Sequence, residues 1–230
     1  MKFSKVAALV ASAAVLFASC ASSNQSTVDY SKKYNFVNWE GKTSNNEVPE
    51  WIGPALSNDL DNLPKNMQKK LKDKYFFVIE SRRERTNDPD ELKLTKQAAD
   101  DNYMTQIARN LNAGIDAQFG GKILSDSDTK EKLTSIASQS KFSGFEKVAD
   151  SWVLTRTTGK DKKRTDTYNV LQIYACDQNT WKNQAQKYLK HLSSSLSENT
   201  ELQEASKHSE EVINRILPSK ATIITSVKVK

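Results

Sequence analysis

The stretch that decides the fold is residues 148–177, which read VADSWVLTRTTGKDKKRTDTYNVLQIYACD. Its two ends are rich in β-branched and aromatic residues, whereas residues 158–164 contain one glycine and four basic residues. This pattern predicts strands over about 142–157 and 167–177, joined by a turn into a β-hairpin. In the second strand the apolar positions change parity, from Tyr168 and Val170 to Leu171 and Ile173. The change indicates either a central strand covered on both faces or a β-bulge.

The flanking sequence predicts one further strand and several helices, recognised by apolar residues at the period of each element. The expected elements are a strand at 75–82, helices at 64–73, 90–119, 129–140, 181–196 and 199–217, and an edge strand or loose tail at 219–230. This order predicts an α+β fold, with a small antiparallel sheet that contains the hairpin, helices packed on one face, and a C-terminal helical extension.

Composition excludes several classes of protein. Only 37% of the 230 residues are hydrophobic and 27% are charged, which excludes a polytopic membrane protein. Two cysteines are too few for a disulfide scaffold or for a structural zinc site built from paired cysteines. Length is sufficient for one proper core, so we expect a single domain over residues 48–218.

The N-terminus has the pattern of an export signal. Lys2 and Lys5 precede an apolar stretch at 6–17, which is too short to span a bilayer. Ala18 and Ser19 before Cys20 resemble the lipobox of bacterial lipoproteins, in which the chain is cut before the cysteine and the cysteine carries lipid. We therefore expect a signal peptide at 1–19, cleavage between Ser19 and Cys20, and lipidation of Cys20. The alternative is an ordinary cleaved secretory signal and a soluble periplasmic protein.

Two further residues of this region indicate the membrane to which the protein would be delivered. Phe17 replaces the usual aliphatic residue of the box, as in the relaxed boxes of spirochaete lipoproteins, and Ala21 stands where an inner-membrane retention signal has aspartate. The favoured destination is the outer membrane. Residues 20–47 are rich in Ser, Asn, Thr and Lys, which predicts a lipidated flexible tether. Trp39 in this tether is expected either to dock onto the domain or to contact a partner.

A set of motifs after the tether resembles a known family. They are Pro49-x-Trp51, an Ala-rich helix that includes Ala98 and Ala99, Trp152 on the following strand, and a strand with Tyr168 that leads to Trp181. Together with the export signal they resemble the small bacterial outer-membrane lipoproteins typified by the twenty-kilodalton membrane-associated lipoprotein of Helicobacter, related in fold to the flagellar lipoprotein FlgP, in a spirochaete-type member. The resemblance covers about 48–195, with a polar insert between Trp51 and Tyr75 as the main departure. It implies a non-enzymatic envelope protein, in some members a part of surface or flagellar assemblies.

The side chains that carry chemistry do not form a recognisable catalytic motif. His191 and His208 lie on separate predicted helices without metal-ligand spacing, and Cys176, at the end of an apolar strand, is expected to be a buried structural thiol. We expect no catalysis, metal or cofactor. The basic clusters at 69–74, 82–85 and 160–164 favour solvated faces and turns, with contact to anionic lipid headgroups or cell-wall polymers as the remaining interpretation. Nucleic acid is not an expected partner.

These observations predict a lipid-anchored cell-envelope protein with a structural or protein-interaction role. Its expected partners are the membrane, through the N-terminal lipid, other envelope proteins, and further copies of itself. The alternative is a periplasmic or outer-membrane lipoprotein that binds cell-wall polymer, lipid or a small ligand. For this role the candidate interaction residues are Trp39, Pro49, Trp51, Trp152, Tyr168 and Trp181.

Overall fold

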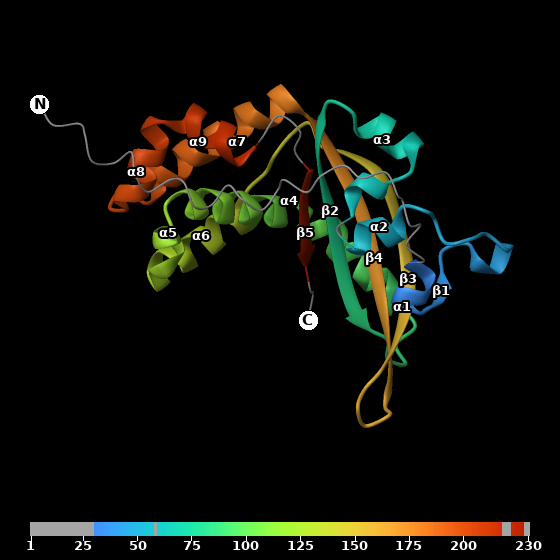
Figure 1. Cartoon of the computed structure of the whole chain (residues 1–230). Coiled ribbons are helices and arrows are strands. Elements are labelled where there is room, and N and C mark those ends of the chain that lie inside the picture. The colour runs from blue at the N-terminus through green and yellow to red at the C-terminus, as the bar shows by residue number, and fades with distance from the viewer. Residues whose placement is uncertain (1–29, 58, 218–221, 228–230) are drawn as a thin grey trace, which may run out of the picture.

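Five strands form one sheet in the order β1-β3-β4-β2-β5 (Figure 1). The computed structural model describes residues 30–57, 59–217 and 222–227, so the predicted signal peptide, Ser19 and Cys20 lie outside the described residues. The strands are β1 (Phe36–Trp39), β2 (Lys74–Glu84), β3 (Glu146–Thr158), β4 (Arg164–Asp177) and β5 (Thr222–Val227). With helices packed against this sheet, the fold is α+β, as the sequence predicts.

The predicted hairpin is the longest feature of the sheet. β3 and β4 pair antiparallel from Glu146 opposite Ala175 to Thr158 opposite Arg164. β2 pairs antiparallel with the other side of β4, and β1 pairs antiparallel with β3. β5 lies at the edge and runs parallel to β2, which confirms the edge-strand alternative for the C-terminal residues. The sheet is therefore mixed, and its antiparallel part consists of β1 to β4.

β4 is covered on both faces, which explains the parity change in its sequence. Tyr174 and Cys176 belong to the core on one face of the sheet, whereas Leu171 and Ile173 belong to the core on the other. The irregularity in pairing lies in β3, between Lys147 and Ala149. The two-faced strand is thus the correct alternative for β4.

The first face is covered by six helices that form the larger core. They are α4 (Glu91–Gln118), α5 (Lys122–Ser125), α6 (Ser127–Gln139), α7 (Gln178–Ser195), α8 (Thr200–Lys207) and α9 (Ser209–Ile216) (Figure 1). Ile107, Leu111 and Ile115 are buried along one stripe of α4. Gly114 allows α9 to approach closely, because a Cβ at this position would lie 2.7 Å from Cγ2 of Ile216.

The second face is covered by helices as well, which corrects the expectation of helices on one face only. α2 (Ile52–Ser57) and α3 (Lys65–Leu71) lie on the side of the sheet away from α4 (Figure 1). Met67 and Leu71 of α3 pack with Leu171 and Ile173 of the sheet. The physical reason is that a central strand with two apolar faces needs cover on both, and the polar insert after Trp51 supplies it.

The N-terminal boundary of the domain also differs from the expectation. α1 (Tyr30–Tyr34) and β1 precede residue 48, and Phe36 and Trp39 pack against the second-face core. The Tyr30 ring lies directly on Gly53, where a Cβ would approach within 2.4 Å, and the Tyr30 hydroxyl donates to Asp59 at 2.8 Å. The fold thus includes the chain from Tyr30 onward. The sequence does not reveal this, because aromatic side chains spaced among polar residues find their partners only in the tertiary structure.

The predicted helix at 199–217 is two helices. α8 begins after Asn199, whose side chain accepts a hydrogen bond from the Leu202 amide at 2.9 Å, and α9 begins after His208. Glu210 and Glu211 lie in the first turn of α9, where negative charge favours a helix N-terminus. The helical extension is otherwise as predicted.

Candidate functional site

The predicted interaction residues divide between the core and one end of the sheet. Trp51 and Trp181 are buried in the second-face and first-face cores, respectively. The Pro49 carbonyl accepts a hydrogen bond from the Ile52 amide at 2.9 Å and so begins α2. Trp51 and Trp181 therefore serve core packing, and Pro49 helps to begin α2.

Trp39, Trp152 and Tyr168 lie at the end of the sheet from which the β3–β4 hairpin projects. Trp152 and Tyr168 are partly buried neighbours across the hairpin, with ring centroids 5.8 Å apart in an edge-to-face arrangement. Trp39 pairs with Val153 on the neighbouring strand, and its Nε1 donates to the Asn46 carbonyl at 2.7 Å. Of the two alternatives for Trp39, the structure shows docking onto the domain.

The root of the hairpin is held by an ion pair and by the incoming N-terminal chain. Arg156 donates two hydrogen bonds to Asp166 across the hairpin, at 2.6 and 2.8 Å. The hydrogen bonds from Arg156 lower the pKa of Asp166, and the same pairing raises the pKa of Arg156. Asn35, just before β1, bonds to the Arg156 backbone twice, through its carbonyl at 3.2 Å and its side-chain amide at 3.1 Å. The N-terminal segment is therefore fixed to the hairpin root.

A shallow groove of about 440 Å³ lies beside this root. Three cationic side chains line it: Lys42 from the turn after β1, Arg85 from the residue after β2, and Arg156 from β3. Lys42 is held by a hydrogen bond to the Val37 carbonyl and lies 4.6 Å from the centre of the Trp39 ring. We term this feature the root groove.

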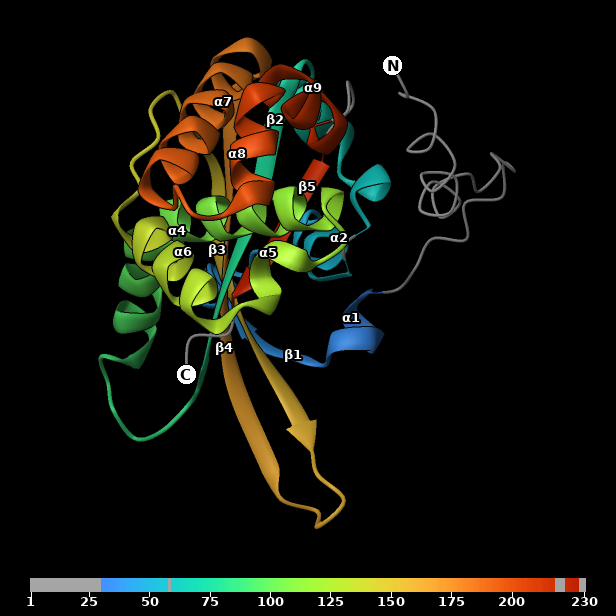
Figure 2. The same cartoon turned by 90° about the vertical axis from the view of Figure 1, so that its left-hand side faces the viewer.

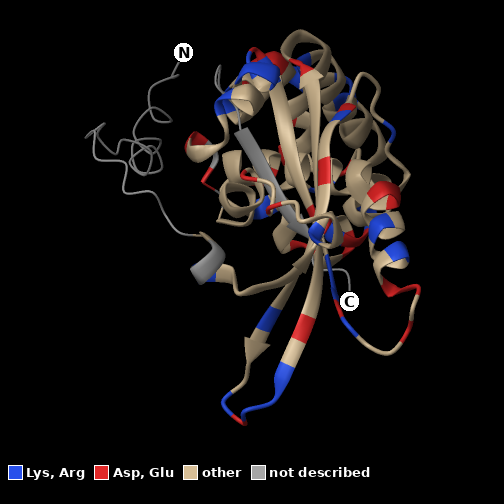
Figure 3. Ribbon diagram, turned by 90° about the vertical axis from the view of Figure 1, so that its right-hand side faces the viewer, with Lys and Arg blue, Asp and Glu red and all other residues tan. Residues whose placement is uncertain are grey.

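The tip of the hairpin, residues 157–164, is fully exposed and predominantly basic (Figure 3). We call Lys160, Lys162, Lys163 and Arg164 the tip cluster. Among the described residues, the three lysine side chains make no ion pair. Residues 156–166 contain five basic side chains and two carboxylates, a net charge of +3. The sequence identified this cluster as a turn, but only the structure shows that it stands away from the body of the molecule.

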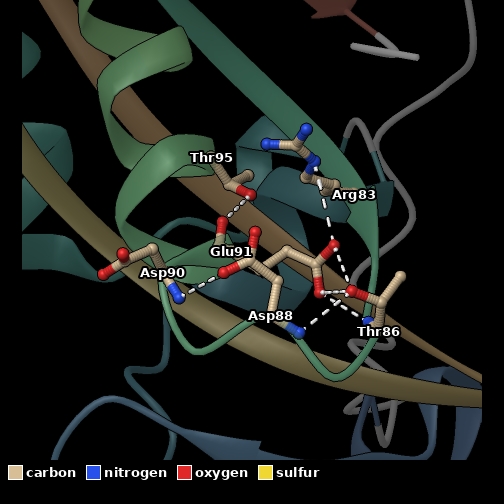
Figure 4. A network of polar contacts seen from close by, with 6 residues as sticks. All are labelled: Arg83, Thr86, Asp88, Asp90, Glu91 and Thr95. Atoms are coloured by element: carbon tan, nitrogen blue, oxygen red, sulfur yellow. Dashed lines mark hydrogen bonds and ion pairs between the residues drawn. The ribbon is translucent and has the colours of Figure 1, made fainter.

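A buried carboxylate fixes the loop between β2 and α4 next to this end of the sheet (Figure 4). Glu91 is only 5% exposed, and its carboxylate accepts hydrogen bonds from the amide and hydroxyl of Thr86. Arg83 lies 3.9 Å away, and the Thr95 hydroxyl donates to the Glu91 carbonyl at 2.7 Å. Since its oxygens are occupied by these partners, Glu91 has a structural role.

A second carboxylate is bound between α4 and the sheet. Oδ1 of Asp100 accepts hydrogen bonds from Gln172 at 2.8 Å, from the Tyr174 hydroxyl at 3.1 Å, and from Lys147. Burial raises the pKa of Asp100, but the hydrogen bonds from Lys147 and Gln172 outweigh this effect and lower it overall. Tyr103 stacks on Tyr174 with centroids 3.9 Å apart. Asp100 is thus an ionised carboxylate that joins α4 to β3 and β4, a poor proton donor.

One further cleft lies between α6 and α7, with a volume of about 400 Å³. Phe142 and Tyr188 form an aromatic wall, with centroids 5.6 Å apart, while Lys141, Lys187 and His191 contribute polar groups. No sequence pattern predicts this cleft, because its residues come from two helices and a loop whose packing is not visible in local patterns.

The described residues contain no cluster of three or more His, Cys, Asp or Glu side chains that could hold a metal ion. None of their helices combines the length and apolar character that crossing a membrane requires. No family model, curated protein or solved structure matches the chain. The resemblance to outer-membrane lipoproteins therefore stays a prediction from the sequence.

Proposed function

We propose that this chain is a lipid-anchored protein of the bacterial cell envelope, held to the outer membrane through Cys20, with a structural or protein-interaction role and no catalysis. The sequence support is the export signal and the lipobox-like residues that end at Cys20. The family proposal, a small outer-membrane lipoprotein, rests on the same residues and on the order of the motifs that follow.

The observation that carries the proposal is the way in which the chain enters the domain. Cys20 precedes Tyr30 by ten residues, which span at most about 35 Å when fully extended. From Tyr30 onward the chain is fastened to the fold, first on Gly53 and then by Asn35 at the hairpin root. A lipid on Cys20 would therefore hold one defined end of the domain close to the membrane surface.

The two edges of the sheet support an interaction role. Among the described residues, β1 pairs only with β3 and β5 pairs only with β2, so each has one side without a strand partner. A strand from another protein, or from a second copy, can add to such an edge through backbone hydrogen bonds.

Three titratable groups, of which Glu91 and Cys176 are buried and Asp100 is exposed, support a non-catalytic role. Glu91 and Asp100 are held by hydrogen bonds within the fold. Cys176 is 1% exposed, and burial raises its pKa to about 11, so that its thiol is protonated and a weak nucleophile at neutral pH.

The test is the intact mass and detergent partitioning of the protein purified from bacterial membranes. We expect a chain that starts at Cys20, carries diacylglycerol and acyl chains, and enters the detergent phase. Cys20→Ala should lose the lipid mass, whereas Cys176→Ala, the matched cysteine control, should retain it. A mature wild-type protein without lipid that stays in the aqueous phase would refute the proposal.

A second candidate function, binding of a small ligand, is favoured by the cleft between α6 and α7. Its aromatic wall next to Lys141, Lys187 and His191 suits an anionic molecule with an apolar part. Phe142 also contacts Trp181, with ring centroids 5.0 Å apart. Binding of an aromatic carboxylate such as naphthoate should therefore change tryptophan fluorescence, and Phe142→Ala should abolish the change.

A further inference from the structure

We infer that the tip cluster of the β3–β4 hairpin docks on the anionic phosphate groups of the lipid surface that carries the Cys20 anchor. The inference rests on the proposed function, since it takes the anchor as given and assigns a second, electrostatic contact to the same surface. The hairpin would thereby set the orientation of the domain on the membrane.

The charges of the hairpin are arranged for this contact. Asp166, one of its two carboxylates, is neutralised at the root by Arg156. The other, Asp161, lies in the turn, and its Oδ1 accepts a hydrogen bond from the Lys163 amide at 3.1 Å. The three tip lysines remain exposed without ion pairs among the described residues, so they can approach phosphate groups without breaking an existing pair.

Glu84, at the end of β2, pairs opposite Thr167 at the hairpin root, and further acidic residues lie in the loop before α4. There, Oδ1 of Asp88 accepts a hydrogen bond from the Asp90 amide at 2.9 Å, at the positive end of the α4 dipole. Figure 3 shows the hairpin tip extending beyond this loop. A flat anionic surface that meets the tip would therefore contact lysines before it approaches these carboxylates.

The length of chain between Cys20 and Tyr30 allows a lipid on Cys20 and the hairpin tip to reach one surface. Asn35 binds the backbone of Arg156, and the turn at Gly159–Lys162 is closed by the Lys162 amide donating to the Gly159 carbonyl at 3.0 Å. Four extended residues from Arg156 to Lys160 cover about 13 Å, well within the reach of about 35 Å of the ten residues that join Cys20 to Tyr30. The cationic root groove, lined in part by Arg156, lies at the base of the same hairpin.

The expected strength follows from the number of free lysines. One basic residue near an anionic membrane strengthens binding about fivefold, and the effect falls off within a Debye length of about 8 Å at physiological salt. Replacing three lysines should therefore reduce the ratio of docked to undocked hairpins on the order of 100-fold. The anchor itself does not depend on this contact, because acyl chains hold by apolar burial.

The experiment reconstitutes the full lipidated protein into vesicles of neutral phosphatidylcholine, with or without phosphatidylglycerol. A donor dye on Thr158→Cys reports the distance to acceptor-labelled headgroups, since the buried Cys176 does not compete for labelling. The test variant is Lys160→Gln/Lys162→Gln/Lys163→Gln. The matched control is Lys69→Gln/Lys70→Gln/Lys72→Gln, which removes the same charge at α3. Circular dichroism checks that both variants keep the fold.

We expect energy transfer to rise when phosphatidylglycerol is present, to fall with added salt, and to be lost in the tip variant but not in the control. Equal transfer on both vesicle types, or equal loss in both variants, would overturn the inference. Failure of the wild type to float with neutral vesicles would instead show that the anchor is absent, and both proposals would fall. Retention on isolated peptidoglycan that depends on the tip, without a difference between vesicles, would assign the tip to a wall polymer and also overturn the inference.

Discussion

Trp181 provides a quantitative test of the first-face core. It is 1% exposed and makes edge-to-face contacts with Phe77, Phe142 and Phe145, at centroid distances of 5.6, 5.0 and 5.3 Å. Its Nε1 is buried and has no hydrogen-bond partner among the described residues. The side chain therefore combines a large apolar contact with one unsatisfied donor.

Two substitutions separate the effect of the apolar contact from that of the unsatisfied donor. Trp181→Ala removes the whole ring and should lower the free energy of unfolding by about 3–5 kcal/mol. Trp181→Phe loses part of the ring, at a cost of roughly 1–2 kcal/mol on the same scale, but it also removes a buried donor whose desolvation costs about 1–3 kcal/mol. The net effect of Trp181→Phe should thus lie between about 1 kcal/mol less stable and about 2 kcal/mol more stable than the wild type.

The assay is urea unfolding followed by far-ultraviolet circular dichroism, which does not depend on the tryptophan that is replaced. Trp39→Phe is the matched control, because it deletes an indole N–H that has a partner, and it should cost about 1 kcal/mol. If Trp181→Phe destabilises the protein as much as Trp181→Ala does, the Nε1 group has a partner in solution and the reasoning is wrong.

Three other predictions concern titratable groups. Asp166→Asn should lower the free energy of unfolding at neutral pH. Because the pairing with Arg156 lowers the folded-state pKa of Asp166, the stability that the pair contributes is present above the unfolded pKa and is lost as pH falls through the folded pKa. The unfolding curves of variant and wild type should therefore converge in acid. Cys176 should react with a thiol reagent in the native state far more slowly than after unfolding, because its pKa is raised to about 11 by burial; equal rates would contradict its burial. Glu91→Ala should cost about 2 kcal/mol in thermal unfolding, since it leaves the Thr86 amide without its acceptor, and a loss below about 0.5 kcal/mol would show that water replaces the carboxylate.

The elements that the sequence predicted are those encoded by local patterns. The strand at 75–82, the helix at 90–119 and the hairpin each have an apolar period that matches their structure, and they appear as β2, α4 and β3–β4. The helices predicted at 129 and 181 begin two and three residues earlier in the structure, where Asp126 and Asp177 accept hydrogen bonds from the amides of Thr129 and Thr180.

The features that the sequence did not reveal depend on partners far along the chain. β1 falls within the predicted tether because the composition of residues 20–47 is polar, and only its pairing with β3 shows that it is a strand. The helix at 64–73 is visible in the sequence and appears as α3, but its polar residues do not reveal that Met67 and Leu71 cover the second face of the sheet. At the candidate site, the basic turn was visible in the sequence, but its position next to Asn35 and Arg156 was not, because that contact joins residues 121 positions apart.

The parallel pairing of β5 with β2 has a consequence for the order in which the fold can be completed. The Tyr75 hydroxyl donates to the carbonyl of Leu217, 142 residues further along the chain, and β5 follows this point. Contacts between such distant residues must overcome the entropy of closing a long loop, and they form late in folding. A chain that emerges from its amino end, during synthesis or during transport through a channel, presents β2 long before the strand that flanks it exists. Among the described strands β5 emerges last and completes the sheet, so a nascent chain stalled just before residue 222 would expose the side of β2 that β5 covers.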